Sequence, residues 1–271
     1  MSARATPAVA TVEFEALADD AWLLRLGERI DDALNARVHA LAARVRAQAP
    51  AWLRDLVPAY ASLAVFFDPH AVEAEAVRAW LLRHCNESAD DDARGGAART
   101  VEIPVAYGGE FGPDLDAAAH ELGLSPPQLI ERHSGGDYRV AMIGFAPGFP
   151  YLSGLEPALA LPRLATPRTQ VAAGSVAIGG AQTGIYPRPG PGGWRLLGRT
   201  PLRLFDAARD TPSLLQPGDR VRLRPIGADE FHALEAGSPE AAARQAGAPN
   251  PATPAPRGAG TVADAARTPA R

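Results

Sequence analysis

The chain has 271 residues, enough for two domains of ordinary size, and its formal net charge of −4 argues against nucleic acid or an anionic membrane as the main partner. Its single cysteine excludes a disulfide framework and a thiolate metal cluster. Because no apolar run approaches the roughly 20 residues of a membrane span, and the first residues lack the apolar core of a signal peptide, we expect a soluble, cytoplasmic protein.

All 27 basic residues are arginine. The lack of lysine excludes a P-loop lysine, a Schiff base with pyridoxal phosphate and a biotinylated carrier site, because each of these needs a primary side-chain amine. An anionic ligand would therefore have to be bound by arginine.

The first part of the sequence predicts a small α+β domain over residues 10–85, preceded by a disordered N-terminus over residues 1–9. The first predicted helix buries an apolar stripe that runs at helical spacing from Ile30 to Val45. The element order favours a sandwich in which helices cover one face of an antiparallel sheet. The strands are expected at 12–14, 21–26, 53–57 and 62–67, and the helices at 28–46 and 69–84.

A polar linker is predicted over residues 86–98, and a second domain over residues 99–230. This domain begins with a strand and two short helices, the second of which starts with a capping-box pattern at Ser125. Short apolar segments then alternate with glycine and proline turns, which is typical of a barrel or sandwich. The tail, residues 236–271, has almost no large apolar residues and is predicted to be disordered.

The segment 144–201 concentrates nine prolines and eleven glycines among aromatic and branched apolar residues. Proline removes backbone donors and glycine supplies positive φ, so this segment cannot form one long helix. It is also too apolar to be a disordered linker. We therefore expect tightly turned β structure here, and we place the functional site within it.

Several motifs of this segment occur in a fixed order. They are Gly144-Phe-Ala-Pro-Gly-Phe-Pro-Tyr-Leu152, Thr166-Pro-Arg168, Ala173-Gly-Ser-Val-Ala-Ile-Gly-Gly180, Gln182-Thr-Gly-Ile-Tyr-Pro187, Pro191-Gly-Gly-Trp194 and Gly198-Arg-Thr-Pro201. Through them the chain resembles the allophanate hydrolase subunit 1 family, also called the KipI family, over about residues 10–226. The resemblance implies an α+β N-terminal sandwich domain followed by an all-β cyclophilin-like barrel domain.

The family includes subunits of ATP-dependent 5-oxoprolinases, and the resemblance implies this role first. The chain would open 5-oxoproline to glutamate together with the C-type and A-type subunits of a 5-oxoprolinase, and would be inactive alone. ATP with Mg²⁺ would act at the level of the complex, because this chain has no complete nucleotide motif. The alternatives are a carboxyltransferase-type subunit of a biotin-dependent urea or amide carboxylase, and a non-enzymatic inhibitor of a sensor histidine kinase.

Three charged residues are the strongest candidates for a site. His133, which precedes a Gly-Gly turn, is the candidate catalytic acid or base because histidine titrates near neutrality, and its alternative role is a helix cap. The family resemblance covers this position and favours the functional role. Arg168 and Arg199 carry planar forks that suit carboxylate or phosphate, with rim salt bridges as the alternative.

The remaining candidates come from the same motifs. Ser175 lacks the hydrolase nucleophile elbow and is expected to form hydrogen bonds at a glycine bend. No group of residues has metal-ligand spacing, so no metal is expected. The other substrate- or phosphate-binding candidates are Gln182, Thr183, Tyr186 and Trp194, and the pocket-shaping candidates are Gly144, Phe145, Pro147, Gly148, Phe149, Gly174, Gly179 and Gly180.

Overall fold

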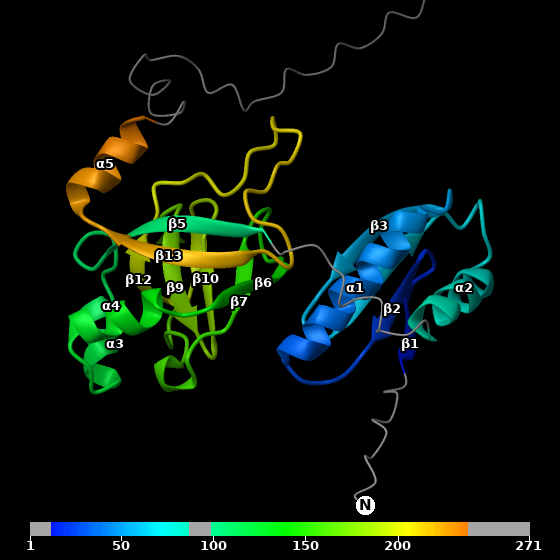
Figure 1. Ribbon diagram of the computed structural model, residues 1–271, viewed down its shortest axis with the longest axis horizontal. Coiled ribbons are helices and arrows are strands. Elements are labelled where there is room, and N and C mark those ends of the chain that lie inside the picture. The colour runs from blue at the N-terminus through cyan, green and yellow to red at the C-terminus, as the bar shows by residue number, and fades with distance from the viewer. Residues whose placement is uncertain (1–11, 87–98, 238–271) are drawn as a thin grey trace, which may run out of the picture.

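The computed structural model describes residues 12–86 and 99–237, so the predicted linker, most of the tail and the first residues lie outside the described part. Figure 1 shows a helix-covered sheet lying beside a barrel. The elements of the first part alternate pairs of strands with single helices, as predicted. They are β1 Glu13–Ala18, β2 Ala21–Arg25, α1 Asp32–Gln48, β3 Leu53–Pro58, β4 Ser62–Phe67 and α2 Ala74–Asn86.

The first sheet is antiparallel, with strand order β1-β2-β4-β3. Its apolar side chains form one core with those of α1 and α2. The predicted stripe of α1 is confirmed at Val38 and Val45 but wrong at Ile30, which is 60% exposed. The reason is the cap: the Asp31 side chain accepts the Leu34 N–H at 2.9 Å, so the helix begins after Ile30.

The second part of the chain contains a closed barrel with strand order β10-β7-β6-β13-β5-β12-β9. This confirms the barrel prediction. The first and last barrel strands, β5 and β13, pair in parallel, with Thr100 opposite Arg220 and Ala106 opposite Ile226. Outside the barrel, β8 Arg168–Val171 pairs with β11 Gly190–Gly192 in a separate two-stranded ribbon. The barrel strands are β5 Thr100–Tyr107, β6 Tyr138–Ile143, β7 Pro150–Ser153, β9 Ser175–Gly179, β10 Gln182–Ile185, β12 Arg195–Arg199 and β13 Arg220–Ile226.

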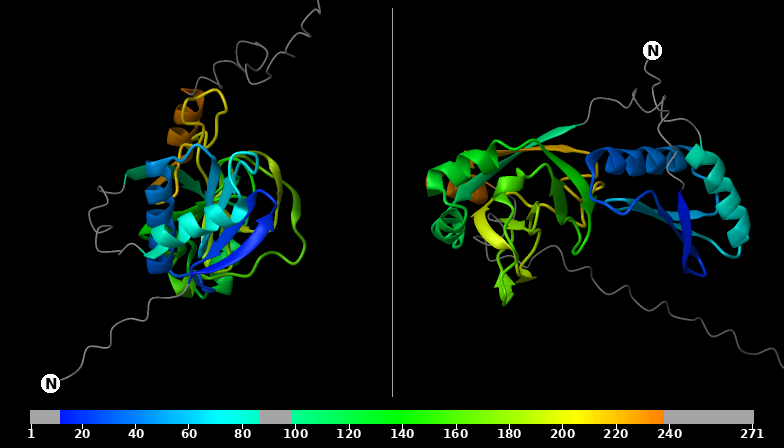
Figure 2. Two further views of the ribbon diagram at one scale, coloured as in Figure 1. Left: turned by 90° about the vertical axis from the view of Figure 1, so that its right-hand side faces the viewer. Right: turned by 90° about the horizontal axis from the view of Figure 1, so that it is seen from below.

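Three helices accompany the barrel, so the domain as a whole is not all-β, and the first two are the two short helices predicted from the sequence. They are α3 Leu115–Glu121, α4 Pro126–Ser134 and α5 Ala228–Ala236. The capping box of α4 is confirmed, because both of its reciprocal hydrogen bonds are present. The sequence did not predict α5, which is anchored by the fully buried Phe231 against Phe111, with 4.6 Å between ring centroids. In Figures 1 and 2 all three lie on the side of the barrel away from the first sheet.

One backbone carbonyl of β6 contacts two side chains of the first part of the chain. The Ala141 oxygen accepts the Asn35 amide at 3.1 Å and lies 2.9 Å from the His39 Nε2, both from α1. Burial lowers the pKa of His39, which favours the neutral ring in this contact. Tyr60 and Tyr151 add an edge-to-face contact at 6.1 Å. Among the described residues, no helix is long and apolar enough to cross a membrane.

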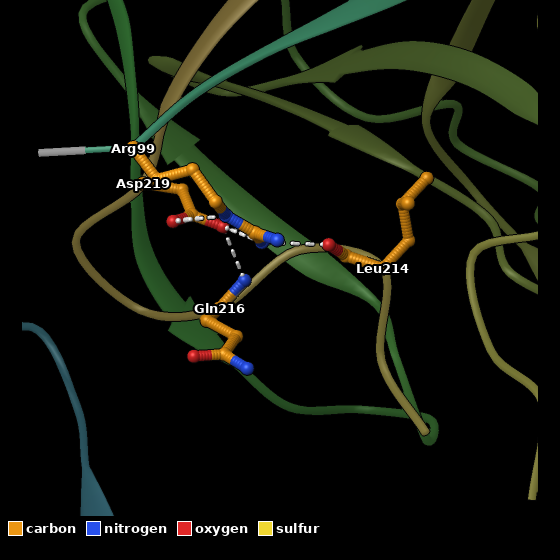
Figure 3. Close-up of polar contacts among 4 residues, drawn as sticks. All are labelled: Arg99, Leu214, Gln216 and Asp219. Carbon is orange, nitrogen blue, oxygen red and sulfur yellow. Dashed lines mark hydrogen bonds and ion pairs between the residues drawn. The ribbon is translucent and has the colours of Figure 1, made fainter. Parts of the chain in front are cut away.

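The start of β5 is fastened to the loop before β13 by an ion pair (Figure 3). The Arg99 guanidinium donates to both carboxylate oxygens of Asp219 and, at 2.7 Å, to the Leu214 carbonyl. The Oδ2 atom of the buried Asp219 carboxylate, which accepts from Arg99, also accepts the Gln216 N–H at 2.7 Å. One carboxylate therefore organises the loop and joins the two strands that close the barrel.

Replacing Asp219 with alanine is expected to lower the free energy of unfolding by about 2–3 kcal/mol, because a charged hydrogen-bond network loses its acceptor. Urea unfolding at neutral pH measures this loss. The matched control is Asp137→Ala, which breaks the exposed pair between Arg220 and Asp137 and should cost less than about 1 kcal/mol. Equal losses in the two variants would mean that burial adds nothing to the Asp219 contacts.

Candidate functional site

The loop between β6 and β7, residues 144–149, holds an exposed aromatic side chain in a strained turn. Phe145 has a φ of 64° and is 65% exposed. The Ala146 N–H donates to the Gly144 carbonyl at 2.7 Å, so Phe145 is the central residue of a γ-turn with positive φ, a strained and rare type. The Phe149 N–H and carbonyl fix the turn through bonds of 2.9 Å to Ala146 and 3.1 Å to Gly144. Phe145 therefore faces solvent instead of lining a pocket.

Beneath this loop, three aromatic rings form a packed cluster. The ring centroid of Phe149 lies 5.2 Å from that of Tyr186 and 5.6 Å from that of Trp194, both in edge-to-face geometry. Gly179 is required here because a Cβ at this position would lie 2.4 Å from the Trp194 indole. Tyr186 and Trp194 are both buried, so the structure corrects their predicted role: they support the loop rather than contact a ligand.

A cavity of about 280 Å³, which we call the arginine pocket, borders the same loop through Pro147. Its lining includes one carboxylate and three guanidinium groups. The carboxylate is that of Glu235, and the guanidinium groups are those of Arg188, Arg199 and Arg203. The rest of the lining comes from the backbone around Gly174 and from proline and other apolar side chains. Motif residues and the unpredicted helix α5 thus build one charged cavity together.

Arg199 is held in this pocket from both sides. Its Nε donates to the Ala173 carbonyl at 2.9 Å, and its Nη2 lies 3.5 Å from the Glu235 carboxylate. The guanidinium carbon also lies 5.4 Å from the centroid of the Phe231 ring, within the range of a cation–π contact. The side chain keeps about a third of its surface exposed, so its outer edge remains accessible to a ligand.

Arg168, which we expected to act with Arg199, does not line the arginine pocket. Its Nη2 donates to the Asp114 carboxylate at 2.6 Å, and the second oxygen of that carboxylate accepts the Leu196 N–H at 2.8 Å. The Nη1 atom is buried without a hydrogen-bond partner among the described residues. The structure therefore separates the two arginines and gives Arg168 an internal ion pair.

His133 lies in the barrel core, where it joins a chain of hydrogen bonds. Its Nδ1 is 2.9 Å from the Tyr107 hydroxyl, and its Nε2 is 2.9 Å from the Thr183 hydroxyl. Thr183 donates its own proton to the Ala177 carbonyl at 2.9 Å, so it must accept from Nε2–H, and Nδ1 accepts from Tyr107. These partners favour one neutral tautomer, and burial lowers the pKa of His133 to about 3.

The prediction that His133 titrates near neutrality is therefore wrong. The ring has no exposed surface, and both of its nitrogens are occupied by internal partners. Thr183, a predicted ligand-binding residue, is equally buried within the same chain of hydrogen bonds. Both side chains belong to the interior that supports the barrel.

Most of the other predicted residues do not line the pocket. Ser175 is buried at the start of β9, where its carbonyl accepts the Tyr186 N–H at 2.9 Å. Gln182 is half-buried at the start of β10, where it pairs with Gly179. Gly148, with a φ of 79°, packs so closely on Phe205 that a Cβ would lie 2.7 Å away. The glycines thus shape the pocket's surroundings through close backbone approach.

Sequence reasoning missed Arg188, Arg203 and Glu235. Arg188 stands between two prolines inside the motif segment, so its position could have identified it as a candidate ligand-binding residue. Arg203 donates to the Phe205 carbonyl at 2.9 Å and lies 3.4 Å from the Asp206 carboxylate. Glu235 could not be found, because its approach to Arg199 depends on α5. Within the described ranges, no group of three or more His, Cys, Asp or Glu side chains could hold a metal ion.

Comparison with known proteins confirms the family resemblance. The family described as the carboxyltransferase domain, subdomain C and D, matches residues 12–215. The B-type subunit of the 5-oxoprolinase from Bacillus subtilis (strain 168) is 42% identical over 233 residues, which are 82% of this chain and 96% of that protein.

Solved structures share the fold. The crystal structure of TTHA0988 superposes with a TM-score of 0.68 at 41% identity, covering 77% of this chain and 40% of that one, so this chain spans less than half of it. The Kluyveromyces lactis urea carboxylase superposes with a TM-score of 0.63 at 20% identity, covering 82% of this chain and 22% of that one. The second likeness concerns the fold alone.

Proposed function

The chain belongs to the family of the carboxyltransferase domain, subdomain C and D, and on this premise we propose that it is the B-type subunit of a cytoplasmic, ATP-dependent 5-oxoprolinase. The observation that carries the proposal is the 42% identity to a B-type 5-oxoprolinase subunit over 96% of that protein. In this proposal residues 10–85 and 99–230 are the two domains, and the barrel is of the cyclophilin-like type.

The reaction opens the lactam of 5-oxoproline to glutamate, and its unfavourable equilibrium makes coupling to ATP chemically sensible. A phosphorylated lactam oxygen is one intermediate that would develop negative charge, which arginine can stabilise. The arginine pocket supports binding of an anionic substrate, because Arg199 combines a fixed position with an accessible edge. We assign Arg168 and His133 to the supporting structure instead.

This chain acts in the proposal with the C-type and A-type subunits of the complex. Its sequence has no complete nucleotide motif, so ATP with Mg²⁺ is used by the complex and not by this chain alone. The related TTHA0988 chain extends well beyond the part shared with this one, which is compatible with a site completed by further protein. Catalysis then requires both halves to position the reactants.

The purified chain is expected neither to hydrolyse ATP nor to consume 5-oxoproline, and adding the C-type and A-type subunits should restore ATP hydrolysis that depends on 5-oxoproline. Release of phosphate and glutamate measures this, with omission of 5-oxoproline as the control. Turnover by the isolated chain would contradict a shared site. Co-purification with a biotin protein or a sensor histidine kinase, in place of the C-type protein, would favour one of the alternative roles.

A further inference from the structure

The arginine pocket carries an excess of positive charge. Of Arg188, Arg199 and Arg203, Arg199 faces the carboxylate of Glu235 and Arg203 lies 3.4 Å from that of Asp206, just outside the lining. Arg188 forms no hydrogen bond or ion pair with any residue of the described ranges and lies exposed at the pocket rim. Because guanidinium forks bind planar oxyanions in a bidentate manner, this lining suits a carboxylate or a phosphoryl group.

The size and apolar walls of the pocket favour a small carboxylate. Its volume of about 280 Å³ is at the lower end of small-molecule sites, which run from roughly 300 Å³ upward. Pro147, Pro187 and Pro201 give rigid apolar surfaces next to the arginines. These features fit a small five-membered ring that carries one carboxylate better than they fit a whole nucleotide.

Glu235 already presents a carboxylate to Arg199. The pair is long, at 3.5 Å, and both side chains keep about a third of their surface exposed, so the attraction is weak. Helix α5 does not depend on this pair, because the buried Phe231 anchors it against Phe111. A ligand carboxylate can therefore replace Glu235 on Arg199 without unseating the helix.

We infer that the arginine pocket binds the carboxylate of 5-oxoproline through Arg199, and that Glu235 competes with it as an internal carboxylate. The substrate named here rests on the proposed function. The pocket then selects its ligand by the charge of the carboxylate at one end and by the small size of the ring at the other. Glu235 sets the affinity, because its carboxylate must leave Arg199 before the ligand can bind there.

Calorimetric titration of the full chain at low salt tests this inference with three probes: 5-oxoproline, the uncharged lactam 2-pyrrolidinone and inorganic phosphate. We expect 5-oxoproline to bind with a Kd of roughly 1 mM or below, and 2-pyrrolidinone to bind at least about tenfold more weakly. Phosphate binding tighter than 5-oxoproline binding would overturn the carboxylate assignment. Absence of 5-oxoproline binding would overturn the inference altogether.

Two variants with matched controls give opposite expected results. Arg199→Gln should weaken 5-oxoproline binding by about 10- to 100-fold, whereas Arg222→Gln, on the exposed outer face of β13, should leave it unchanged. Glu235→Gln should tighten binding by about three- to tenfold, and Glu230→Gln on the same helix should not. Unchanged affinity in both pocket variants would overturn the inference.

The same titrations separate this inference from the proposed function. If the complex opens 5-oxoproline but Arg199→Gln leaves the affinity of the chain for 5-oxoproline unchanged, the pocket assignment fails and the proposed function stands. If the chain binds 5-oxoproline through Arg199 but the complex shows no ATP-dependent turnover, the function fails and the pocket assignment stands.

Discussion

Replacing His133 with alanine is expected to lower the free energy of unfolding by about 4 kcal/mol. The variant leaves a cavity in the barrel core and removes the acceptor of the Tyr107 hydroxyl and the donor to Thr183. His133→Gln should cost less, about 1–2 kcal/mol, because an amide can accept from one neighbour and donate to the other. Urea unfolding at pH 7 measures both values.

The same histidine should make the protein sensitive to acid. Its pKa is about 3 in the folded chain, against an ordinary value of 6.5, so the unfolded state binds more protons between these two pH values. Stability therefore falls as the pH drops from about 6.5 towards about 3, by on the order of 5 kcal/mol in total. His133→Gln removes the titrating group and should flatten this part of the stability curve.

His120→Ala is the matched control, because His120 is exposed on α3. It should change the free energy of unfolding at pH 7 by less than about 0.5 kcal/mol. If the free energy of unfolding depends on pH in the same way in the parent chain and in His133→Gln, another group causes the acid sensitivity.

Replacing Gly174 with alanine is expected to lower the free energy of unfolding by about 3–5 kcal/mol. Gly174 has a φ of 81°, which favours glycine, and a Cβ there would lie 2.1 Å from the Thr200 carbonyl oxygen. The backbones of Gly174 and Thr200 are joined by a hydrogen bond of 2.9 Å, so neither can move aside without breaking it. Thermal or urea unfolding measures the loss.

Gly180→Ala separates crowding from backbone strain. Gly180 has a similar φ of 66°, but a Cβ there would meet nothing within 4 Å. The substitution should therefore cost only the left-handed conformation, about 1–2 kcal/mol. If both glycine variants lost the same free energy, the close approach to Thr200 would contribute nothing, and the wall of the arginine pocket would be more adaptable than its geometry indicates.

Local patterns were sufficient to predict much of the fold. The alternation of strands and helices in the first domain, the capping box at Ser125 and the turn-rich barrel segment each depend on residues close in sequence. The start of α1 was misjudged because the cap at Asp31 prevailed over the apolar spacing that included Ile30. Helix α5 escaped prediction because its stability depends on packing of Phe231 against a distant segment.

The candidate site was predictable as a region but not as a set of contacts. The density of glycine and proline located the segment that contributes Gly174 and Arg199 to the pocket. Nothing in the sequence distinguished Arg199 from Arg168, because the difference is made by Asp114, 54 residues away along the chain. Likewise, the sequence shows His133 only as a histidine near the end of a helix. Its complete burial depends on how the barrel closes around it.

The parallel pairing of β5 with β13 also determines when the barrel can form during synthesis. These strands are about 120 residues apart, and such distant contacts form slowly. Pairing in the first sheet needs only residues up to 67, so that sheet can assemble while the rest of the chain is still being made. Until Arg220 to Ile226 arrive, β5 and β6 each keep an unpaired edge that can recruit other chains. Chains cut short before Arg220 should therefore aggregate through their unfinished barrel.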